Sequence, residues 1–385
     1  MKVRSKVFVV AVGIAALLGI GLWIPPSPGQ PKGLPPEPAG KVFLNLRDYG
    51  AIGDGKADDG PALQKALDAL AVAGGGRLVV PPGRFLIKTP AEKDFFNKAS
   101  AIRIEGSGSA GQLVVAVGQG KTAIRIGNVD HLTIDGITFV GLPKVPVDAD
   151  IAVAVGGGEV TTFRDCDFCG LSGGPAISAA QTDLLVARCT FLGCSNNRGG
   201  IVHNSQWRGV RVEDCRFLDY GTINGSYRDI EAVSTRAWLL CEDAMDYPVS
   251  ATRHQNCVTV RNTLMDEGAA YGVFVNPTKG RVSRVHIDDL QDNVARSENG
   301  VGVYLRKVDY AVIENSFIGY STGAACDAVR LESVTSTRLE RVLCLQSANR
   351  ITADKACGKL TLEDCVYKTL NSAAKKTIGA DGGKE

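Results

Sequence analysis

The sequence predicts an all-β fold, a parallel β-helix whose short strands stack coil upon coil behind a capping α-helix. Three observations carry this prediction: a strand pattern that recurs every 23 to 29 positions, a second short strand at a similar offset in each repeat, and one amphipathic segment before the repeats. Apolar alternation at this period, without helical periodicity, is typical of stacked coils that bury a shared core.

The segment before position 41 precedes the repeats and reads as export and spacing sequence. A basic start is followed by an uncharged run over 7–24, a length between that of a signal peptide and that of a spanning helix. We expect 1–24 to be either a cleaved signal peptide or an uncleaved membrane anchor. In both cases the rest is exported: periplasmic, extracellular, or membrane-anchored with the β-helix outside the cytoplasm. Residues 25–40 are proline-rich and predict an extended linker.

The charge balance argues against a nucleic-acid partner. The 385 residues carry a formal net charge of +2, and three of the positive charges are Lys2, Arg4 and Lys6. The rest of the chain is thus close to neutral, whereas nucleic-acid-binding domains carry a strongly basic face.

Residues 50–60 form a Gly- and Asp-rich loop with the composition of a ligand-binding loop. An EF-hand beginning at Asp54 requires ligands or glycine where Lys56, Asp59 and Lys65 stand. A P-loop requires Ser or Thr where Ala57 stands. Both kinds of site are therefore excluded.

The same loop leads into a predicted helix over 59–73. Asp58 or Asp59 can cap its start, with Pro61 in the first turn, and the glycines of 74–77 end it. The open end of a solenoid must be covered, and an amphipathic helix serves that need. The apolar stripe that would face the first coils is Ala62, Leu63, Ala66, Leu67 and Leu70.

The repeats begin after less regular strands in 77–127. Their clearest copies are 132–139, 161–168, 184–191, 210–217, 258–265 and 360–367, each apolar, any, apolar, polar, polar, Cys or small, any, apolar. The gap from Cys215 to Thr263 is about twice the usual period, and Cys241 lies near its middle. We therefore expect a further coil at Cys241. The sixth positions of the copies are Ile137, Cys166, Cys189, Cys215, Thr263, about Asp289, Ser316, Val342 and Cys365.

Each repeat contains a second short strand, as in 200–204, 271–276, 302–306 and 328–332. A leucine-rich repeat is the alternative, but its fixed asparagine and leucine frame are missing. We expect one β-helix domain over 41–370 and a polar tail over 371–385.

The segment 46–87, "LRDYGAIGDGKADDGPALQKALDAL…GGGRLVVPPGRFLI", resembles the entry segment of the pectate-lyase-like superfamily of rhamnogalacturonase- and epimerase-like proteins. The close match is confined to this segment, and the coil pattern extends the resemblance to about position 370. The resemblance implies a single-stranded, right-handed parallel β-helix whose members cleave, epimerise or bind polysaccharides, some without catalysis.

The strands of the 302–306 type are the predicted substrate face. If Val303 and Leu305 point inward, Tyr304 and Arg306 point outward. Outward residues on adjacent coils then form a row that matches an extended glycan. By the same alternation the other predicted contacts are Phe274, Asn276, Arg330 and Glu332.

Acidic residues near these strands are the catalytic candidates. Asp243 or Asp246, paired with Asp266 or Glu267, would supply the two carboxylates of glycoside hydrolysis. Arg306 would neutralise a uronate carboxylate. The competing interpretation is that these acids only solubilise surface turns.

Several motifs of the related enzymes are missing. The chain has no paired-Asp or Gly-His-Gly motif of polygalacturonases, no Arg-x-x-Pro-x-x-Arg of calcium-dependent pectate lyases, and no Tyr-Gly-x-Asp-Pro-His of epimerases. Arg306 and Lys307 are adjacent, so only one can face the groove. Alternation predicts an inward, hydrogen-bonded His203.

Eleven cysteines give three alternatives. The leading one is a buried column of Cys166, Cys189, Cys215 and Cys241, since buried cysteine behaves as a small hydrophobe. Disulfides between turns, with Cys169–Cys194 the best pair, and a zinc site are the others. No cofactor and no metal ligand set is predicted, and no motif indicates Ca²⁺.

The function predicted from these features is hydrolysis or elimination of glycosidic bonds in an extracellular polysaccharide, which can contain uronic acids, by a protein that acts outside the cytoplasm. The alternative is a non-catalytic β-helix that binds glycan or serves as a cell-surface structural element. The expected partners are a polysaccharide and, if the first segment is uncleaved, the membrane.

Overall fold

The computed structural model describes residues 42–95, 101–142, 149–194, 200–207, 209–218, 235–244, 257–266, 269–277, 280–293, 300–319, 326–345 and 350–379. The chain divides into Met1–Pro35 and Pro36–Glu385, and all described residues belong to the second unit. The predicted export segment 1–24 and the linker 25–40 lie outside the described residues. Within the described part, no helix has both the length and the hydropathy to cross a membrane.

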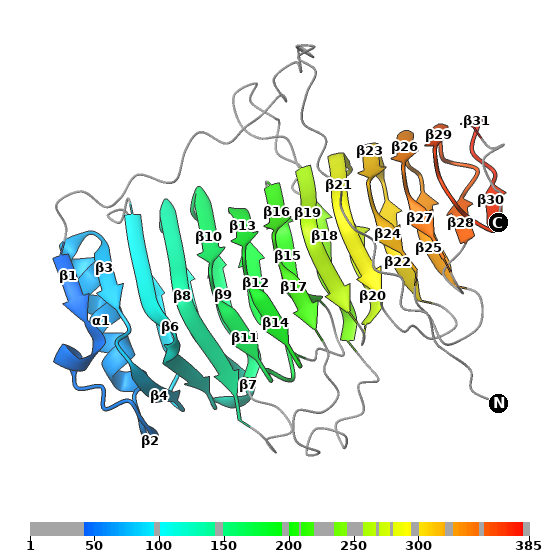
Figure 1. The fold of residues 1–385 in the computed structure, drawn as a ribbon. Helices are drawn as coiled ribbons and strands as arrows, with labels where there is room; N and C mark the ends of the chain where they lie inside the picture. Colours follow the sequence, from blue (N-terminus) through cyan, green and yellow to red (C-terminus); the bar gives the residue numbers. More distant parts are fainter. Residues whose placement is uncertain are drawn as a thin grey trace, which may run out of the picture. The chain divides into compact units, whose positions relative to one another are not determined.

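The described residues form a solenoid with two long parallel sheets (Figure 1). The 20-stranded sheet contains β1 (Val42–Asn45), β2 (Asp54–Asp58), β3 (Gly76–Val79), β4 (Gly83–Ile87), β6 (Ala101–Val115), β8 (His131–Gly141), β10 (Val160–Arg164), β11 (Asp167–Cys169), β13 (Asp183–Ala187), β14 (Thr190–Leu192), β16 (Gly209–Glu213), β17 (Arg216–Leu218), β19 (Cys257–Asp266), β21 (Val282–Asn293), β23 (Val308–Glu314), β24 (Phe317–Ile318), β26 (Ser336–Glu340), β27 (Leu343–Cys344), β29 (Lys359–Glu363) and β31 (Lys376–Ile378). The 11-stranded sheet contains β5 (Ala91–Asp94), β7 (Gly118–Gly127), β9 (Ala149–Gly156), β12 (Ile177–Ala180), β15 (Gly200–Trp207), β18 (Thr235–Ala244), β20 (Ala269–Asn276), β22 (Val301–Arg306), β25 (Asp327–Glu332), β28 (Arg350–Ala353) and β30 (Thr369–Ser372).

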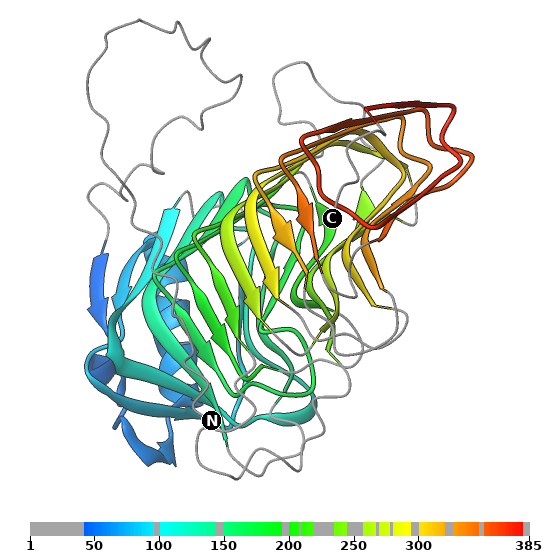
Figure 2. The same cartoon turned by 45° about the vertical axis from the view of Figure 1, so that its right-hand side comes forward.

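Each coil adds one strand to the 11-stranded sheet and two strand segments to the other, and the last coils are seen as loops around the core (Figure 2). Neighbouring strands are parallel, as in β10 with β13 and β22 with β25. The predicted all-β, single-stranded, right-handed parallel β-helix is thus confirmed. Strands β30 and β31 continue the solenoid to Ile378, so the boundary predicted at 370 is too early.

The predicted capping helix is α1 (Gly60–Ala73), and it begins where two aspartates meet the first coils. Asp59, 1% exposed, accepts hydrogen bonds from the amides of Ile52, Gly53 and Leu86. Asp58 accepts from the amide of Gly60, the amides of 88 and 89, and the hydroxyl of Thr89. Because these carboxylates bond protein amides, the 50–60 loop is architectural. The predicted stripe is buried at all five positions, Ala62, Leu63, Ala66, Leu67 and Leu70.

A left-handed residue turns the chain at the corner between the two segments of the 20-stranded sheet. One lies directly before the inward residue of each repeat, as Asp165 precedes Cys166. Asn and Asp tolerate this conformation better than most side chains, which explains the polar fifth position of the repeat. In the sixth copy Asp289 is the corner residue, and Leu290 is the inward partner of Thr263. The corner residues are Gly136, Asp165, Arg188, Asp214, Asn262, Asp289, Asn315, Arg341 and Asp364.

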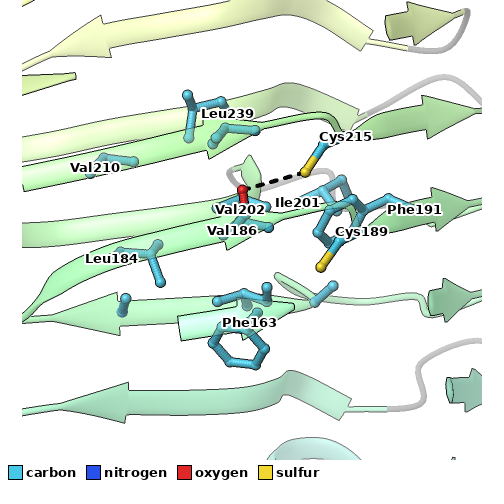
Figure 3. Close-up of a cluster of buried hydrophobic side chains, with 14 of the residues drawn as sticks. Phe163, Leu184, Val186, Cys189, Phe191, Ile201, Val202, Val210, Cys215 and Leu239 are labelled. Carbon is cyan, nitrogen blue, oxygen red and sulfur yellow. Dashed lines mark hydrogen bonds between the residues drawn. The ribbon is translucent and has the colours of Figure 1, made fainter. Parts of the chain in front are cut away.

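The core repeats side chains coil by coil (Figure 3). Phe168 and Phe191 stack at 4.8 Å between ring centroids, and Phe191 and Phe217 at 4.6 Å. Cys189 and Cys215 lie beside them, and the Cys215 thiol donates to the carbonyl of Val186. Burial, followed by the neighbouring thiols, raises the pKa of Cys189 well above its ordinary value. All eleven cysteines are free thiols in this structure.

The long gap between Cys215 and Thr263 corresponds to one coil, and its described residues add no further strand to the 20-stranded sheet. Strands β16 and β17 pair directly with β19, so Cys215 and Thr263 are neighbours in the stack. Cys241 instead lies in β18 of the 11-stranded sheet, in register with Asn204 and Val275. The cysteine column therefore holds Cys166, Cys189 and Cys215, and the predicted place of Cys241 in it is wrong. Spacing alone misled the prediction because the segments 219–234 and 245–256 happen to restore the period.

Candidate functional site

Two rows of residues that point away from the core run along the 11-stranded sheet from β15 to β28, and we call this surface the outer face. Figure 1 shows the course of these strands. The predicted alternation holds, because Val303 and Leu305 are fully buried while Tyr304 is half-buried and Arg306 exposed. The first row, in register, is His203, Leu240, Phe274, Tyr304, Arg330 and Thr352; the second row includes Asn276, Arg306 and Glu332.

An aromatic stack occupies the middle of the first row. The rings of Tyr271 and Phe274 lie 4.4 Å apart, and those of Phe274 and Tyr304 lie 4.9 Å apart, with interplanar angles of 13° and 20°. Phe274 is 3% exposed and packs with Leu240 in a cluster separate from the solenoid core. Such stacking fixes the rings in place, and the partly exposed Tyr271 and Tyr304 are the rings that the outer face presents, whereas the predicted contact Phe274 is buried between them.

A hydrogen-bonded network links this stack to the second row. The Tyr304 hydroxyl donates a hydrogen bond to the carboxylate of Glu332, and Arg306 lies 3.8 Å from the same carboxylate, Nε to Oε2. Arg306 Nη1 also donates to Asn276 Oδ1 at 3.3 Å. Burial, and then the bond to Glu332, raise the pKa of Tyr304 above its ordinary value. Tyr304 is therefore protonated near neutral pH and acts as a donor, not as a base.

A shallow pocket of about 330 Å³ follows the stack on the next two coils. At its base Asp327, 2% exposed, accepts from Arg330 Nε at 2.6 Å, from Arg350 Nε, and from the Thr352 hydroxyl at 3.1 Å. The two guanidinium groups line the pocket and are partly exposed, at 28% for Arg330 and 30% for Arg350. Glu332 and Asp354 also line it.

The structure does not bring the predicted catalytic acids Asp243 and Asp266 together. Asp246 and Glu267 lie outside the described residues, and of the other two only the backbone is described. Glu242 pairs with Asn276 at the carboxyl end of β20, so Asp243 lies at that end, whereas Asp266 precedes β20. The strand between them spans roughly 23 Å at about 3.3 Å per residue. Cooperating carboxylates in glycoside hydrolysis lie within about 10 Å.

His203 is not an inward residue. It pairs with Ser178 and Leu240 in the first row, and the fully buried neighbour is Asn204. The inward residues of this strand are shifted by one position from the predicted ones, and a strand rich in small and polar residues gives only a weak signal for its inward side.

Tyr271, Asp327 and Arg350 were missed as members of the site. Asp327 and Arg350 are one coil length apart in the sequence, so the repeat spacing itself could have placed them side by side. Among the described residues no three His, Cys, Asp or Glu side chains gather as a metal site.

Known proteins resemble this chain in the sequence of its entry segment and in its fold. Residues 43–123 match the family described as rhamnogalacturonase A/epimerase, pectate lyase-like. Mannuronan C5-epimerase AlgE1 of Azotobacter vinelandii is 48% identical over 56 residues, 14% of this chain and 4% of that protein. Alginate lyase 7 of the same organism is 35% identical over 82 residues, 21% of this chain and 9% of that protein. The chain thus matches less than a tenth of the length of either relative.

Among solved structures, PfbA, a surface adhesin of Streptococcus pneumoniae, shares the fold. It has a TM-score of 0.59 and 16% identity, and the match covers 89% of this chain and 94% of that chain. The resemblance of this chain to the pectate-lyase-like superfamily is therefore confirmed by sequence over residues 43–123, and the likeness to PfbA shows a shared fold over the described solenoid.

Proposed function

We propose that this protein binds an extended polysaccharide along the outer face, outside the cytoplasm. The observation that carries the proposal is the first row, in which Phe274 and Tyr304, stacked with the neighbouring Tyr271, lead directly to the guanidinium of Arg330. Apolar ring edges beside fixed hydrogen-bonding groups suit sugars, which present both C–H surfaces and hydroxyls.

The geometry of the solenoid supports a polymer over a small ligand. Adjacent strands in a sheet are about 4.8 Å apart, so equivalent groups recur along the outer face at a spacing comparable with one sugar residue. The row from Leu240 to Thr352 occupies five successive strands, β18, β20, β22, β25 and β28. The names of the relatives, a mannuronan epimerase, an alginate lyase and a surface adhesin, support a polysaccharide ligand and a location outside the cytoplasm.

Cleavage of the bound polysaccharide is the second candidate. Arg306 and Glu332 share the second row at 3.8 Å, where a cation beside a uronate and a carboxylate in reach would serve elimination or hydrolysis. Asp243, Asp246, Asp266 and Glu267 stay a prediction as catalytic acids, but Asp243 and Asp266 would have to act separately, because the backbone places them at opposite ends of β20.

The test compares two tyrosines on opposite sheets. The purified full-length protein is screened by affinity electrophoresis on alginate, pectin, rhamnogalacturonan and a neutral glucan, while reducing ends and unsaturated-uronate absorbance are followed. Tyr304→Ala should weaken binding about tenfold or more, from loss of a stacked ring. Tyr310→Ala, an exposed tyrosine on β23 of the other sheet, is the control and should bind as the wild type does.

Equal binding by both variants would place the polysaccharide elsewhere. No binding to any of the four glycans by the wild type would overturn the proposal. Product formation would establish cleavage, and binding without product would support binding as the function and count against cleavage.

A further inference from the structure

A cluster of two arginines around one buried aspartate closes the outer face at β25 and β28. Asp327 is the first residue of β25 and Arg350 the first residue of β28, and the two are neighbours across the sheet. Arg330 reaches back three residues along its own strand to the same carboxylate. Each oxygen of Asp327 therefore carries one guanidinium, and Thr352 adds a third hydrogen bond.

This arrangement orients both guanidinium groups but leaves their terminal N–H donors without a hydrogen-bond acceptor among the described residues. Each gives its Nε to Asp327. The buried carboxylate offsets one of the two positive charges, so these three side chains together carry one net positive charge, while Glu332 and Asp354 also line the pocket. Guanidinium groups bind oxyanions through paired terminal N–H donors, and here those donors line the pocket.

The two other acids that line the pocket are held by their own partners. Glu332 accepts the Tyr304 hydroxyl and pairs with Arg306. Asp354 accepts the backbone amides of Ser333, Ala356 and Cys357 through one oxygen; burial opposes its ionisation, but these bonds outweigh it and lower its pKa. Both acids therefore have partners other than Arg330 and Arg350.

We infer that Arg330 and Arg350 form a receptor for one oxyanion group, a carboxylate or a sulfate ester, and that Asp327 is the residue that positions them. The receptor lies one coil beyond Tyr304 in the first row. A polymer on the aromatic stack would thus place an anionic substituent in this pocket. In its use of a polymer the inference rests on the proposed function, but capture of a small oxyanion does not.

Arginine footprinting tests the receptor directly. The wild-type full chain is treated with phenylglyoxal alone and with inorganic sulfate, hexamannuronate or neutral mannohexaose, and modification of each arginine is followed by peptide mass spectrometry. Sulfate and hexamannuronate should slow modification of Arg330 and Arg350 several-fold. Arg338, exposed on β26 of the other sheet, is the internal control and should be modified at an unchanged rate.

Variants separate positioning from charge. Arg350→Lys keeps the positive charge but loses the paired N–H donors of the guanidinium group, and should lower sulfate affinity about tenfold or more. Asp327→Asn should abolish the protection of Arg330 although it leaves both arginines in place. Far-UV circular dichroism checks that each variant is folded, and if Asp327→Asn unfolds, Arg350→Lys and Arg330→Lys carry the test.

The outcomes distinguish the receptor from the proposed polysaccharide face. Protection by sulfate but not by hexamannuronate would uphold the receptor and count against the binding of an acidic polysaccharide on this face. Unchanged modification of Arg330 and Arg350 with both anions would overturn the receptor, whichever glycans the protein binds. Equal protection by mannohexaose would also overturn it, since coverage by a neutral chain requires no anion recognition.

Discussion

Replacement of Phe191 by alanine tests the packing that holds the solenoid together. Phe191 is fully buried and is sandwiched between Phe168 at 4.8 Å and Phe217 at 4.6 Å. Phe139 is also buried but stacks on only one ring, Phe168, and has Leu113 in register on its other side. The two sites therefore differ chiefly in the number of ring partners.

The expected magnitudes follow from this difference. A buried Phe→Ala change costs about 3–5 kcal/mol of unfolding free energy. Each stacked ring pair contributes about 0.5–1.5 kcal/mol beyond its buried area. We expect Phe191→Ala to cost about 5 kcal/mol and Phe139→Ala about 1 kcal/mol less. Phe191→Leu, which keeps most of the volume and loses both ring stacks, should cost about 2 kcal/mol.

Urea unfolding followed by far-UV circular dichroism measures these differences. An unchanged dependence of the free energy on urea would show that the same surface is exposed in each variant. A loss of about 1 kcal/mol or less for Phe191→Ala, or a larger loss for Phe139→Ala than for Phe191→Ala, would refute the view that the stacked phenylalanine rings stabilise the solenoid.

Three further predictions concern charge. Arg188 holds the pKa of the Asp165 carboxyl below its ordinary 3.8, chiefly by hydrogen bonding. This pair therefore stabilises the fold above the unfolded-state pKa, and its contribution is lost as the pH falls through the lowered folded-state pKa. Arg188→Ala should lower the free energy of unfolding by less than about 1 kcal/mol at pH 7 and by nothing near pH 2, and a loss of equal size at both pH values would contradict the pairing. The raised pKa of Cys189 predicts no alkylation by iodoacetamide at pH 8 in the folded protein and rapid alkylation in urea; labelling of the native protein at the rate of a free thiol, seen by mass spectrometry, would contradict its burial. Glu332→Gln removes a negative charge beside the arginine pocket and should raise sulfate affinity roughly two- to fivefold in a titration, whereas a fall would mean that Glu332 holds the arginines in place.

Much of the fold could be predicted because each coil repeats the same local chemistry. The inward residues of the repeat and the helix between Asp59 and Gly74 are readable in short windows, whereas the left-handed corner before each inward residue became visible only in the structure. The outward direction of Tyr304 and Arg306 followed from strict alternation in 302–306. Two predictions failed where that local signal is weak: His203, in a strand of small and polar residues, and Cys241, which lies at a coincident spacing.

The candidate site could be predicted only in part. Arg330 and Glu332 were found from their own strand, but the partners that give Arg330 its role, Asp327 and Arg350, were not. The backbone separation of Asp243 from Asp266 could not be predicted for a related reason. Closeness in the sequence does not show that Asp243 lies at the carboxyl end of the sheet strands and Asp266 before their amino end.

The sequence by itself determined the solenoid, its capped beginning and the alternation of its strands, because these depend on periodic burial and on local backbone preference. Only the tertiary structure decided which coils are neighbours and in what register, because long loops can be inserted at little cost in loop-closure entropy and leave no periodic trace. That register stacks Tyr271, Phe274 and Tyr304, and it gathers Asp327 and Arg350 from adjacent coils. The surface on which the proposed function depends is therefore a product of stacking between coils.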